Sequence, residues 1–425
     1  MNRPPGWALV ALLIGSGIPP ALAGWVAQPT NMTRQLYVVH AVSHEVVWAA
    51  GQAGQVGLTV NGGLNWLPRL VPTTFGLGAI FAFDDHTCIV ADQLGRIYRT
   101  TDAGNTWPQV YAGAGKSING MHFFDALHGW ATGDPVGGMY QLLETADAGL
   151  SWQPAPAAPP SQAWNEQGIK RSFDWVGTEI GMFGTNRWKI WRTTNGGASW
   201  DSVTTEMQWV PGLVMSDDGT GLIAGTTEGL ETPMLDRSTD FGQSWTSIPH
   251  PLQATSLFTF AWIDGTAEVW GATRQTGLFH STNGGLDWTR FEIAPPAFHA
   301  VEDLDFVDAD TGWCVGSNGS VARIWRWYGT TGIELAPAPA GLQLVAFPNP
   351  FESNVTFISP LPGAPIAISI YDPLGRCLWE GKASDSAALR WDGRDLAGRP
   401  VASGAYFYRF RMGSETTNGR LIRTR

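Results

Sequence analysis

The stretch Thr59-Val60-Asn61-Gly62-Gly63-Leu64-Asn65-Trp66 decides how this chain folds, because its pattern, Ser/Thr-x-Asp/Asn-x-Gly-x-x-Trp, occurs six times. The final tryptophans of successive copies are 41, 45, 48, 45 and 43 positions apart. A repeat of this length matches one four-stranded β unit, so the pattern predicts an array of such units. The Asp or Asn and the Trp of the six copies are Asn61 and Trp66, Asp102 and Trp107, Asp147 and Trp152, Asn195 and Trp200, Asp240 and Trp245, and Asn283 and Trp288.

Each residue type of this pattern, called the box below, suits a tight β-hairpin turn. The Asp or Asn oxygen can accept N–H bonds from the turn, and the Gly can take a positive φ that a side chain would make costly. The Ser or Thr hydroxyl can close the turn from the other side. The Trp can bury its large apolar surface between neighbouring sheets. We therefore predict that the box residues are structural and do not bind a ligand.

The segments upstream of each box repeat as well. An alternating apolar segment (strand A) precedes a Gly-rich strand (B, for example 129–133), and a third strand (C, for example 96–100) runs into the box, whose Trp opens strand D. The unit at 301–327 has A, B and C but no box, and residues 24–30 look like an isolated strand D. We predict that these two parts pair and close a ring of seven blades over residues 24–332, because closure leaves no exposed sheet edge.

The N-terminal residues have the features of an export signal. Met1-Asn2-Arg3 precedes an apolar run at 7–14 and the small-residue site Ala21-Leu22-Ala23, which predicts a cleaved signal peptide at 1–23. The alternative, a buried helix, is disfavoured by the prolines and glycines that follow the apolar run. No other run approaches membrane-spanning length, so we expect a secreted or cell-surface protein with no transmembrane span in the mature chain.

Composition limits the possible partners. Charged residues make up only 15% of the 425 residues, while Gly reaches 52 and Trp 22, as expected for short strands and turns packed by indoles. Residues 1–341 hold 16 Lys and Arg against 30 Asp and Glu, which argues against nucleic acid as a partner of the main domain. Cys88, Cys314 and Cys377 are too few and too scattered for a disulfide framework or a zinc site, so we expect no metal and no cofactor.

The ligand site is expected on the face opposite the boxes. Strand direction alternates within a blade, so the A–B and box turns share one face of the disc and the B–C and D–A loops share the other. An acidic, basic and aromatic rim on the second face suits a protein or glycan ligand, although the alternative is that most of these are solvated loop residues. The candidates are Asp92, Arg96, Asp134, Arg187, Trp188, Glu228 and Arg274 in B–C loops, and Trp164, Arg171, Trp209 and His299 in D–A connections.

The C-terminal fifth of the chain reads as a separate module. A Pro/Ala linker at 333–341 precedes period-2 strands such as Ile366-Ala367-Ile368-Ser369-Ile370-Tyr371, which are separated by Gly, Pro and Asp. This pattern predicts a small immunoglobulin-like β-sandwich at 342–425. With the repeats before it, the fold class is all-β.

The boxes resemble the Asp-box repeats of sialidase-like propellers. Together with the segment at 123–135, which holds His128-Gly129-Trp130, they are more similar to the propellers of photosystem II stability and assembly factors. That resemblance implies a non-catalytic binding scaffold. A sialidase would need an arginine cluster, a Tyr–Glu nucleophile pair and an acidic Asp. Tyr328 with Glu302 is a forced match for that pair, and Pro68-Arg69-Leu70 departs from the sialidase Arg-Ile-Pro motif. An extracellular glycoside hydrolase is kept as the alternative.

The tail resembles the type A C-terminal sorting domain of the type IX secretion system and the immunoglobulin-like domain of flagellar hook-capping proteins. The motifs behind this are Pro348-Asn349-Pro350-Phe351, Trp391-Asp392-Gly393-Arg394-Asp395 and Ser403-Gly404-Ala405-Tyr406-Phe407-Tyr408. The resemblance implies that secretion machinery recognises this module. The alternative is an ordinary adhesion or spacer module.

Overall fold

The computed structural model forms two compact units, Met1–Gly332 and Ile333–Arg425. The predicted signal peptide at 1–23 and linker at 333–341 lie outside the described residues. The described residues are 24–163, 165–227, 233–249, 258–273, 277–291, 300–318, 321–329, 345–347, 349, 351–358, 366–372, 376–383, 388–412 and 415–424.

The first unit contains seven four-stranded antiparallel sheets among its described residues. We number them 1 to 7 by the chain order of their innermost strands, and each strand pairs with the next one outward. The innermost strands are β2 (Leu36–Ala41), β6 (Leu77–Ala82), β10 (Ile118–Phe123), β14 (Gly168–Val176), β18 (Trp209–Met215), β22 (Thr259–Trp262) and β26 (Ala300–Asp308). The second strands are β3 (Val47–Gly51), β7 (Cys88–Asp92), β11 (Gly129–Val136), β15 (Ile180–Thr185), β19 (Gly221–Thr226), β23 (Val269–Thr273) and β27 (Thr311–Asn318).

The two outer positions of each sheet are filled in the same order. The third strands are β4 (Gln55–Thr59), β8 (Ile97–Thr100), β12 (Met139–Thr145), β16 (Lys189–Thr193), β20 (Pro233–Ser238), β24 (Gly277–Ser281) and β28 (Val321–Tyr328). The outermost strands are β5 (Leu67–Leu70), β9 (Gln109–Tyr111), β13 (Gln153–Pro154), β17 (Asp201–Thr204), β21 (Thr246–Ser247), β25 (Thr289–Phe291) and β1 (Gly24–Ala27). Among the described residues, the helical element is one short 3-10 turn, η1 (Gln52–Gly54). No helix in this part of the chain is long and apolar enough to cross a membrane.

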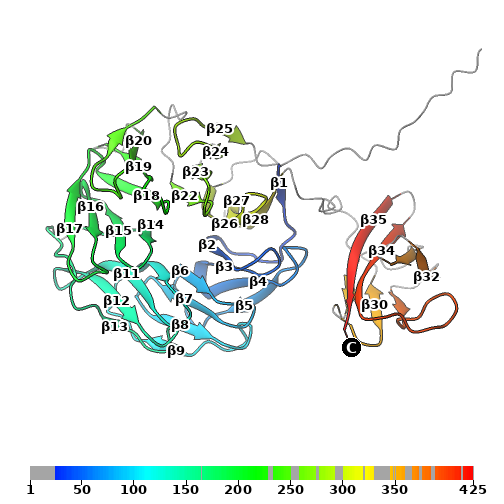
Figure 1. Ribbon diagram of the computed structural model, residues 1–425. Helices are drawn as coiled ribbons and strands as arrows, with labels where there is room; N and C mark the ends of the chain where they lie inside the picture. Colours follow the sequence, from blue (N-terminus) through cyan, green and yellow to red (C-terminus); the bar gives the residue numbers. More distant parts are fainter. Residues whose placement is uncertain are drawn as a thin grey trace, which may run out of the picture. The chain divides into compact units, whose positions relative to one another are not determined.

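The sheets form a ring (Figure 1), and a cavity lined by their innermost strands, called the channel below, lies at its centre. Each innermost strand contacts the innermost strand of the next sheet, and β26 contacts β2. At this seam the outermost strand of sheet 7 comes from the other end of the unit, because β1 pairs antiparallel with β28, Gly24 opposite Tyr328. The predicted pairing of residues 24–30 with the last unit is therefore observed for β1.

Large apolar side chains fill the spaces between neighbouring sheets. One cluster joins Trp48 and Leu58 of sheet 1 to Leu77, Val90 and Trp107 of sheet 2. Between sheets 6 and 7, Trp25 of β1 meets Trp270 of β23 edge to face, with ring centroids 5.4 Å apart. Because each sheet is covered on both faces by its neighbours, the second strands are buried almost throughout.

The boxes form compact hydrogen-bonded turns. In the second box, the Thr100 hydroxyl donates to the Asp102 carboxylate over 2.8 Å and accepts the N–H of Gly104, while Asp102 also accepts the N–H of Thr106. These bonds to its charged form lower the pKa of Asp102 to about 2. Ala103 and Gly104 both take a positive φ, 58° and 77°. Asp102 is thus occupied by its own turn.

Arginines fix most of these turns to the preceding sheet. Arg99 of sheet 2 donates its Nε–H to the carbonyl of Ala148 in the next box, at 2.9 Å. The Nε–H groups of Arg69, Arg192 and Arg237 donate in the same way to Ala103, Phe241 and Gly284, and a terminal N–H of Arg326 donates to Gly62 across the seam. Arg99, Arg192 and Arg237 directly precede the Ser or Thr of a box, a sequence feature that our prediction did not use.

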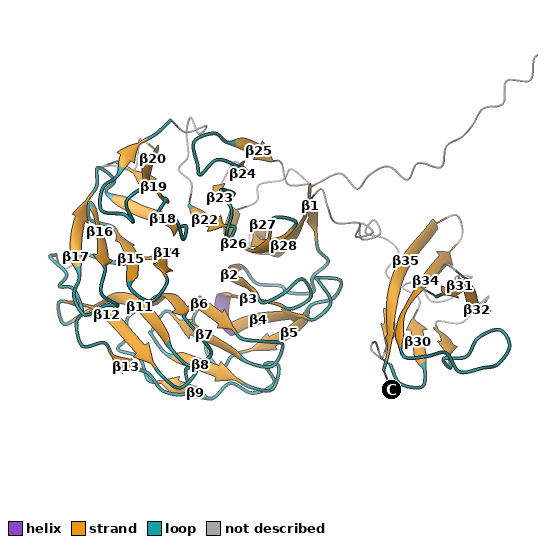
Figure 2. Ribbon diagram, viewed as in Figure 1, coloured by secondary structure: helices purple, strands orange, loops and turns teal. Residues whose placement is uncertain are grey.

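The second unit is a two-sheet sandwich (Figure 2). Its core contains Phe357 and Trp391 from the first sheet and Ile370 and Phe410 from the second. The first sheet is β29 (Val345–Phe347), β30 (Val355–Ile358) and β33 (Ala388–Trp391), and the second is β32 (Cys377–Ala383), β31 (Ile366–Tyr371), β34 (Gly404–Met412) and β35 (Glu415–Arg423).

Candidate functional site

Two of the predicted loop residues hold a turn together. Asp92, fully buried, accepts the N–H groups of Leu94 and Arg96, and the Arg96 guanidinium contacts its other oxygen at 2.5 and 2.8 Å. The Thr73 hydroxyl donates to the same oxygen. A carboxylate with this many donors is engaged by its own chain, so the pair closes the β7–β8 turn.

Asp92 is the last residue of β7, and three further predicted loop residues also lie in strands. Asp134 belongs to β11, Arg171 to β14, and Trp209 is the first residue of β18. The strands run further than the Gly pattern indicates, because bulges extend them: the pairing of β14 with β15 shifts between Gly168 and Phe173. Arg171 sits in that irregular stretch with φ 64°. The loop placement of these residues is therefore corrected.

The other described candidates lie near the B–C face, but each contacts different neighbours and they do not form one site. The Arg187 guanidinium bonds to the Asn165 side chain and lies 5.9 Å from the ring of its neighbour Trp188, whereas Trp209 packs against Phe258, with centroids 5.6 Å apart. The Asn119 side chain donates to Asp134, and burial raises the pKa of that carboxyl. Trp164, Glu228, Arg274 and His299 lie outside the described residues.

A cavity of about 600 Å³ occupies the central channel and is lined by all seven innermost strands. Its lining runs from Arg171 and Asn119 at one end to the β18–β19 and β22–β23 turns at the other. Asp217 and Asp264 in these turns are exposed, so this end reaches the surface. These are A–B turns, so this end of the cavity opens on the face that carries the box turns. The ligand site was expected on the opposite face.

Arg171 spans the channel. From β14 of sheet 4, its guanidinium donates to the carbonyl of Tyr37 in sheet 1 at 2.5 Å and pairs with Glu302 and Asp303 of sheet 7 at 3.4 and 3.7 Å. It also lies 5.3 Å from the ring of Phe258 in front of sheet 6. With 8% of its side chain exposed, it is a buried cation that ties opposite sides of the ring together.

Three aspartates of the channel bind the open edges of neighbouring innermost strands. Asp174 of β14 accepts the N–H of Met215 in β18 at 2.7 Å, while Asp303 and Asp305 of β26 accept the N–H groups of Val39 and Ala41 in β2 at 3.0 and 2.7 Å. An innermost strand has no partner on its channel side, so these donors need acceptors. Sequence reasoning missed these residues. The available signal was acidic residues within apolar A strands, as in Asp303-Leu304-Asp305.

Burial raises the pKa values of two of these carboxyls. The pKa of Asp174 is raised to about 7, and the pKa of Asp303 to about 6 although Arg171 acts in the opposite direction. Nearby, burial and the charge of His40 lower the pKa of His122 to about 4, so His122 is neutral at pH 7.

The raised pKa of Asp174 predicts a pH dependence. Its unfolded-state pKa is near 3.8, so the unfolded chain loses this proton at lower pH than the folded chain does. The contribution of Asp174 to the free energy of unfolding therefore falls as pH rises from about 4 to about 7. We expect Asp174→Asn to lose less stability than the wild type between pH 5 and pH 8 in urea denaturation. Asp201→Asn, on exposed β17, is the control, and its free energy of unfolding should change between pH 5 and pH 8 as much as that of the wild type. If the free energy of unfolding of Asp174→Asn also changed by the wild-type amount, the prediction would be contradicted.

A Tyr–Glu pair exists, but not the one considered from the sequence. The Tyr140 hydroxyl donates to Glu166 at 2.9 Å, and both side chains are buried, Tyr140 at 2% and Glu166 at 3% exposure. Glu166 also accepts the N–H of Gln162. The pair thus fixes the long connection between β13 and β14, and both side chains are buried.

No protein-family profile matches the chain. A xyloglucanase from a Paenibacillus species is 26% identical over 291 residues, which is 55% of this chain. The chain spans about 28% of the length of that curated relative.

Solved structures share the fold at low identity. YCF48 bound to D1 peptide has a TM-score of 0.57 at 17% identity, covering 72% of this chain and 96% of its own. YCF48 from Cyanidioschyzon merolae has a TM-score of 0.55 at 14% identity, covering 72% and 99%. An ancestral GH74 enzyme has a TM-score of 0.56 at 14% identity, covering 93% of this chain and 63% of its own. These likenesses, with the ring of four-stranded sheets, show that the chain contains a β-propeller.

Proposed function

We propose that this chain is an exported, non-catalytic β-propeller that binds a protein or glycan ligand. The observation that supports this best is that Asp174, Asp303 and Asp305 hold backbone N–H groups of neighbouring innermost strands. A general acid or nucleophile has to reach substrate and exchange a proton with it. Carboxylates that close the ring are poorly suited to that work, whereas the cavity around them can hold a ligand.

The proposal includes the finer architecture. We take the seven sheets as blades of one propeller at 24–332, closed by β1, and the sandwich at 342–425 as immunoglobulin-like. The second assignment is supported by Tyr406, near the start of β34, whose hydroxyl donates to the carbonyl of Ala402 at 2.6 Å. Such a bond back to the preceding backbone is the tyrosine corner of immunoglobulin-like sandwiches. On the B–C face, Arg187, Trp188 and Trp209 remain candidate ligand contacts.

Delivery is proposed to depend on both ends of the chain. Residues 1–23 would direct export and residues 342–425 would be recognised by secretion machinery. Deleting residues 342–425 should leave the propeller in the periplasm of the native host, as measured by immunoblotting of cell fractions. An unchanged extracellular yield would contradict the sorting role.

An extracellular glycoside hydrolase is the second candidate. It is favoured by the xyloglucanase relative and by the pKa of Asp174, about 7, which a general acid at neutral pH requires. The channel also brings carboxylates of sheets 4 and 7 into one cavity.

One experiment separates the two candidates. The purified full chain is screened on glycan and surface-protein arrays and assayed on xyloglucan, β-glucans and sialosides. We expect saturable binding without turnover, and Asp174→Asn should leave binding in place. Hydrolysis by the wild type that Asp174→Asn abolishes would establish the enzyme and overturn the binding proposal.

A further inference from the structure

The turn between β15 and β16 of sheet 4 contains a tryptophan in a strained conformation. Trp188 has φ 55°, which bulky side chains rarely adopt because the Cβ crowds the following carbonyl oxygen. The corresponding turns of sheets 1 and 2 have glycine at this position, Gly54 with φ 73° and Gly95 with φ 77°. The three turns have the same length, since their last paired residues are Ala50 and Val56, Ala91 and Ile97, and Gly184 and Ile190. The backbone geometry by itself therefore favours glycine where Trp188 stands.

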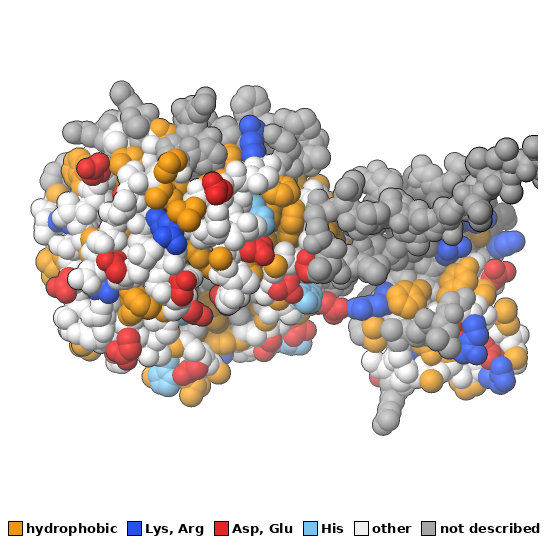
Figure 3. Space-filling view, turned by 45° about the horizontal axis from the view of Figure 1, so that its top comes forward, with side chains coloured by type: hydrophobic (Ala, Val, Ile, Leu, Met, Phe, Trp, Pro, Cys, Tyr) orange, Lys and Arg blue, Asp and Glu red, His pale blue; other side chains and the backbone are white. Residues whose placement is uncertain are grey.

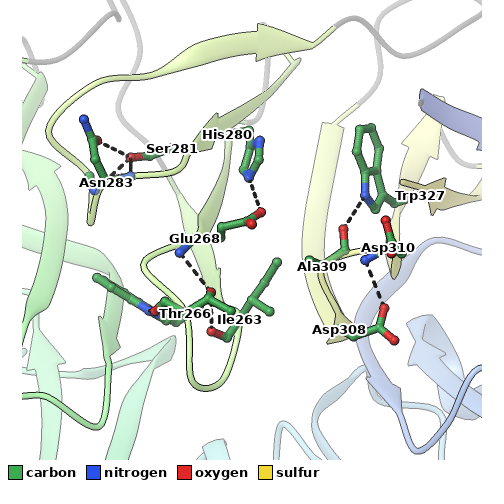
Figure 4. Close-up of polar contacts among 12 residues, drawn as sticks. Ile263, Thr266, Glu268, His280, Ser281, Asn283, Asp308, Ala309, Asp310 and Trp327 are labelled. Carbon is green, nitrogen blue, oxygen red and sulfur yellow. Dashed lines mark hydrogen bonds and ion pairs between the residues drawn. The ribbon is translucent and has the colours of Figure 1, made fainter. Parts of the chain in front are cut away.

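The Trp188 indole is not part of the core. Every other described tryptophan belongs to an apolar cluster or, in the case of Trp209, packs against a ring. Trp327 shows the difference, because it packs between sheets 6 and 7 and its indole N–H donates to the carbonyl of Ala309 at 2.9 Å (Figure 4). Trp188 is half-buried, and among the described residues its indole N–H has no hydrogen-bond partner. Backbone strain is concentrated at functional sites, so a strained tryptophan outside the core indicates a binding role.

Hydrogen bonds hold the turn in this conformation. The Thr185 hydroxyl donates to the carbonyl of Lys189 at 3.0 Å and accepts the N–H of Arg187 at 3.1 Å. The carbonyl of Trp188 accepts the N–H of Thr205, in the connection before β18, at 2.9 Å. The indole is thus presented on a fixed backbone, which reduces the entropy lost when a ligand binds.

Two cations flank the indole. The Arg187 guanidinium lies 5.9 Å from the Trp188 ring and bonds to the Asn165 side chain, and the Lys189 ammonium bonds to the Gln162 side chain. Both acceptors are neutral amide oxygens, and among the described residues neither cation is in an ion pair. Figure 3 shows more acidic than basic side chains on the visible face of the propeller, so this pair of cations is a local exception. A carboxylate placed here would gain charge-assisted hydrogen bonds.

The polar groups around the turn favour a protein ligand over a glycan. A glycan presents mainly hydroxyl groups, which are recognised by side chains with spare donors and acceptors. The amides next to the turn are already bonded within it and to the connection before β14; they are Gln162, Asn165 and Asn186. An indole and two cations remain for the ligand, and Trp and Arg are enriched among the residues that dominate protein interfaces.

We propose that Arg187, Trp188 and Lys189 bind an acidic segment of a protein ligand, in which carboxylates flank an apolar side chain that packs on the indole. The inference rests on the proposed binding function and selects the protein ligand over the glycan. The excess of acidic residues in 1–341 repels polyanions at longer range, so a segment with few charges fits best.

The test of the charges uses end-blocked, dye-labelled pentapeptides Gly-Glu-Phe-Glu-Gly, Gly-Gln-Phe-Gln-Gly and Gly-Glu-Ser-Glu-Gly, titrated into the full chain and followed by fluorescence polarisation. We expect the Glu-Phe-Glu peptide to bind at least about tenfold more tightly than the other two. The double variant Arg187→Gln, Lys189→Gln should abolish its preference over the Gln-Phe-Gln peptide. The matched control, Arg34→Gln with Lys116→Gln, removes the same charge from exposed positions in other D–A connections and should bind like the wild type.

The variant Trp188→Gly separates binding from folding. Glycine takes the positive φ without strain, so this variant should keep the wild-type urea midpoint. Its affinity for the Glu-Phe-Glu peptide should fall to that for the Glu-Ser-Glu peptide. Trp191→Ala, in the cluster between sheets 3 and 4, is the control for a core tryptophan and should lower the midpoint. If Trp188→Gly lowered the midpoint as far as Trp191→Ala does, the indole would be structural and the inference would be overturned.

Three binding outcomes would also overturn the inference. They are equal binding of the Glu-Phe-Glu and Gln-Phe-Gln peptides, no saturable binding of the Glu-Phe-Glu peptide, and equal loss of binding in both double variants. Failure of the proposed function looks different. If the ligand found by the array screen is a glycan whose binding Trp188→Gly leaves unchanged, the binding function stands and only this inference fails. If the chain proves to be a hydrolase, the binding function itself fails.

Discussion

Arg171→Met is expected to lower the free energy of unfolding by about 3–5 kcal/mol at pH 7.5, the range found when one partner of a buried ion pair is removed. The substitution removes the guanidinium that pairs with Glu302 and Asp303 and that donates to the carbonyl of Tyr37. Burial already raises the pKa of Asp303 to about 6 with Arg171 present, so the uncompensated carboxylate is costly. Urea denaturation of the full chain, followed by tryptophan fluorescence, measures the effect.

The pH dependence identifies the cause of this loss. Removing Arg171 raises the pKa of Asp303 further, so below pH 5 the carboxyl is protonated and the loss should shrink. Adding Asp303→Asn to Arg171→Met should restore part of the stability at pH 7.5. Arg34→Met, whose exposed guanidinium bonds to one carbonyl, is the matched control and should cost about 1 kcal/mol or less. A loss that is the same at pH 5 and pH 8 would contradict the assignment.

Trp270→Ala is expected to cost about 3–5 kcal/mol, as large-to-small changes of buried aromatic residues do. Trp270 has 0% exposure and fills the space between sheets 6 and 7, with centroids 4.7 Å from Trp327 and 5.4 Å from Trp25. Trp25 belongs to β1, so the cavity left by the substitution would loosen the strand that completes sheet 7.

Two further variants make the Trp270 experiment specific. Trp270→Phe keeps part of the apolar volume and should lose less than Trp270→Ala. Leu286→Ala removes an apolar side chain that is 50% exposed in the box of the same sheet, and should change stability by no more than about 0.5 kcal/mol. Equal effects of Trp270→Ala and Leu286→Ala would show that the indole is not part of the core.

The sequence was informative where a local rule repeats. The box hydroxyl, carboxylate and Gly bond to residues two to four positions away, so their roles could be inferred without knowing the rest of the chain. The spacing of the tryptophans then predicted the size of each sheet. The pairing of β1 with β28 was also accessible, because a strand D at one end matched a missing strand D at the other.

The contacts between charged residues in the channel depend on the tertiary structure. Asp174, Asp303 and Arg171 are separated by tens to more than a hundred positions from the groups they bind, and no short-range pattern reports such contacts. A strand bulge moved Arg171 from an expected loop into a strand, since the extra residues in β14 between Gly168 and Phe173 change which side chains face the channel. The sequence by itself determined the repeating hairpins, because their hydrogen bonds are local. Only the closed ring decided which charges meet across the channel, because that depends on how seven sheets are placed around it.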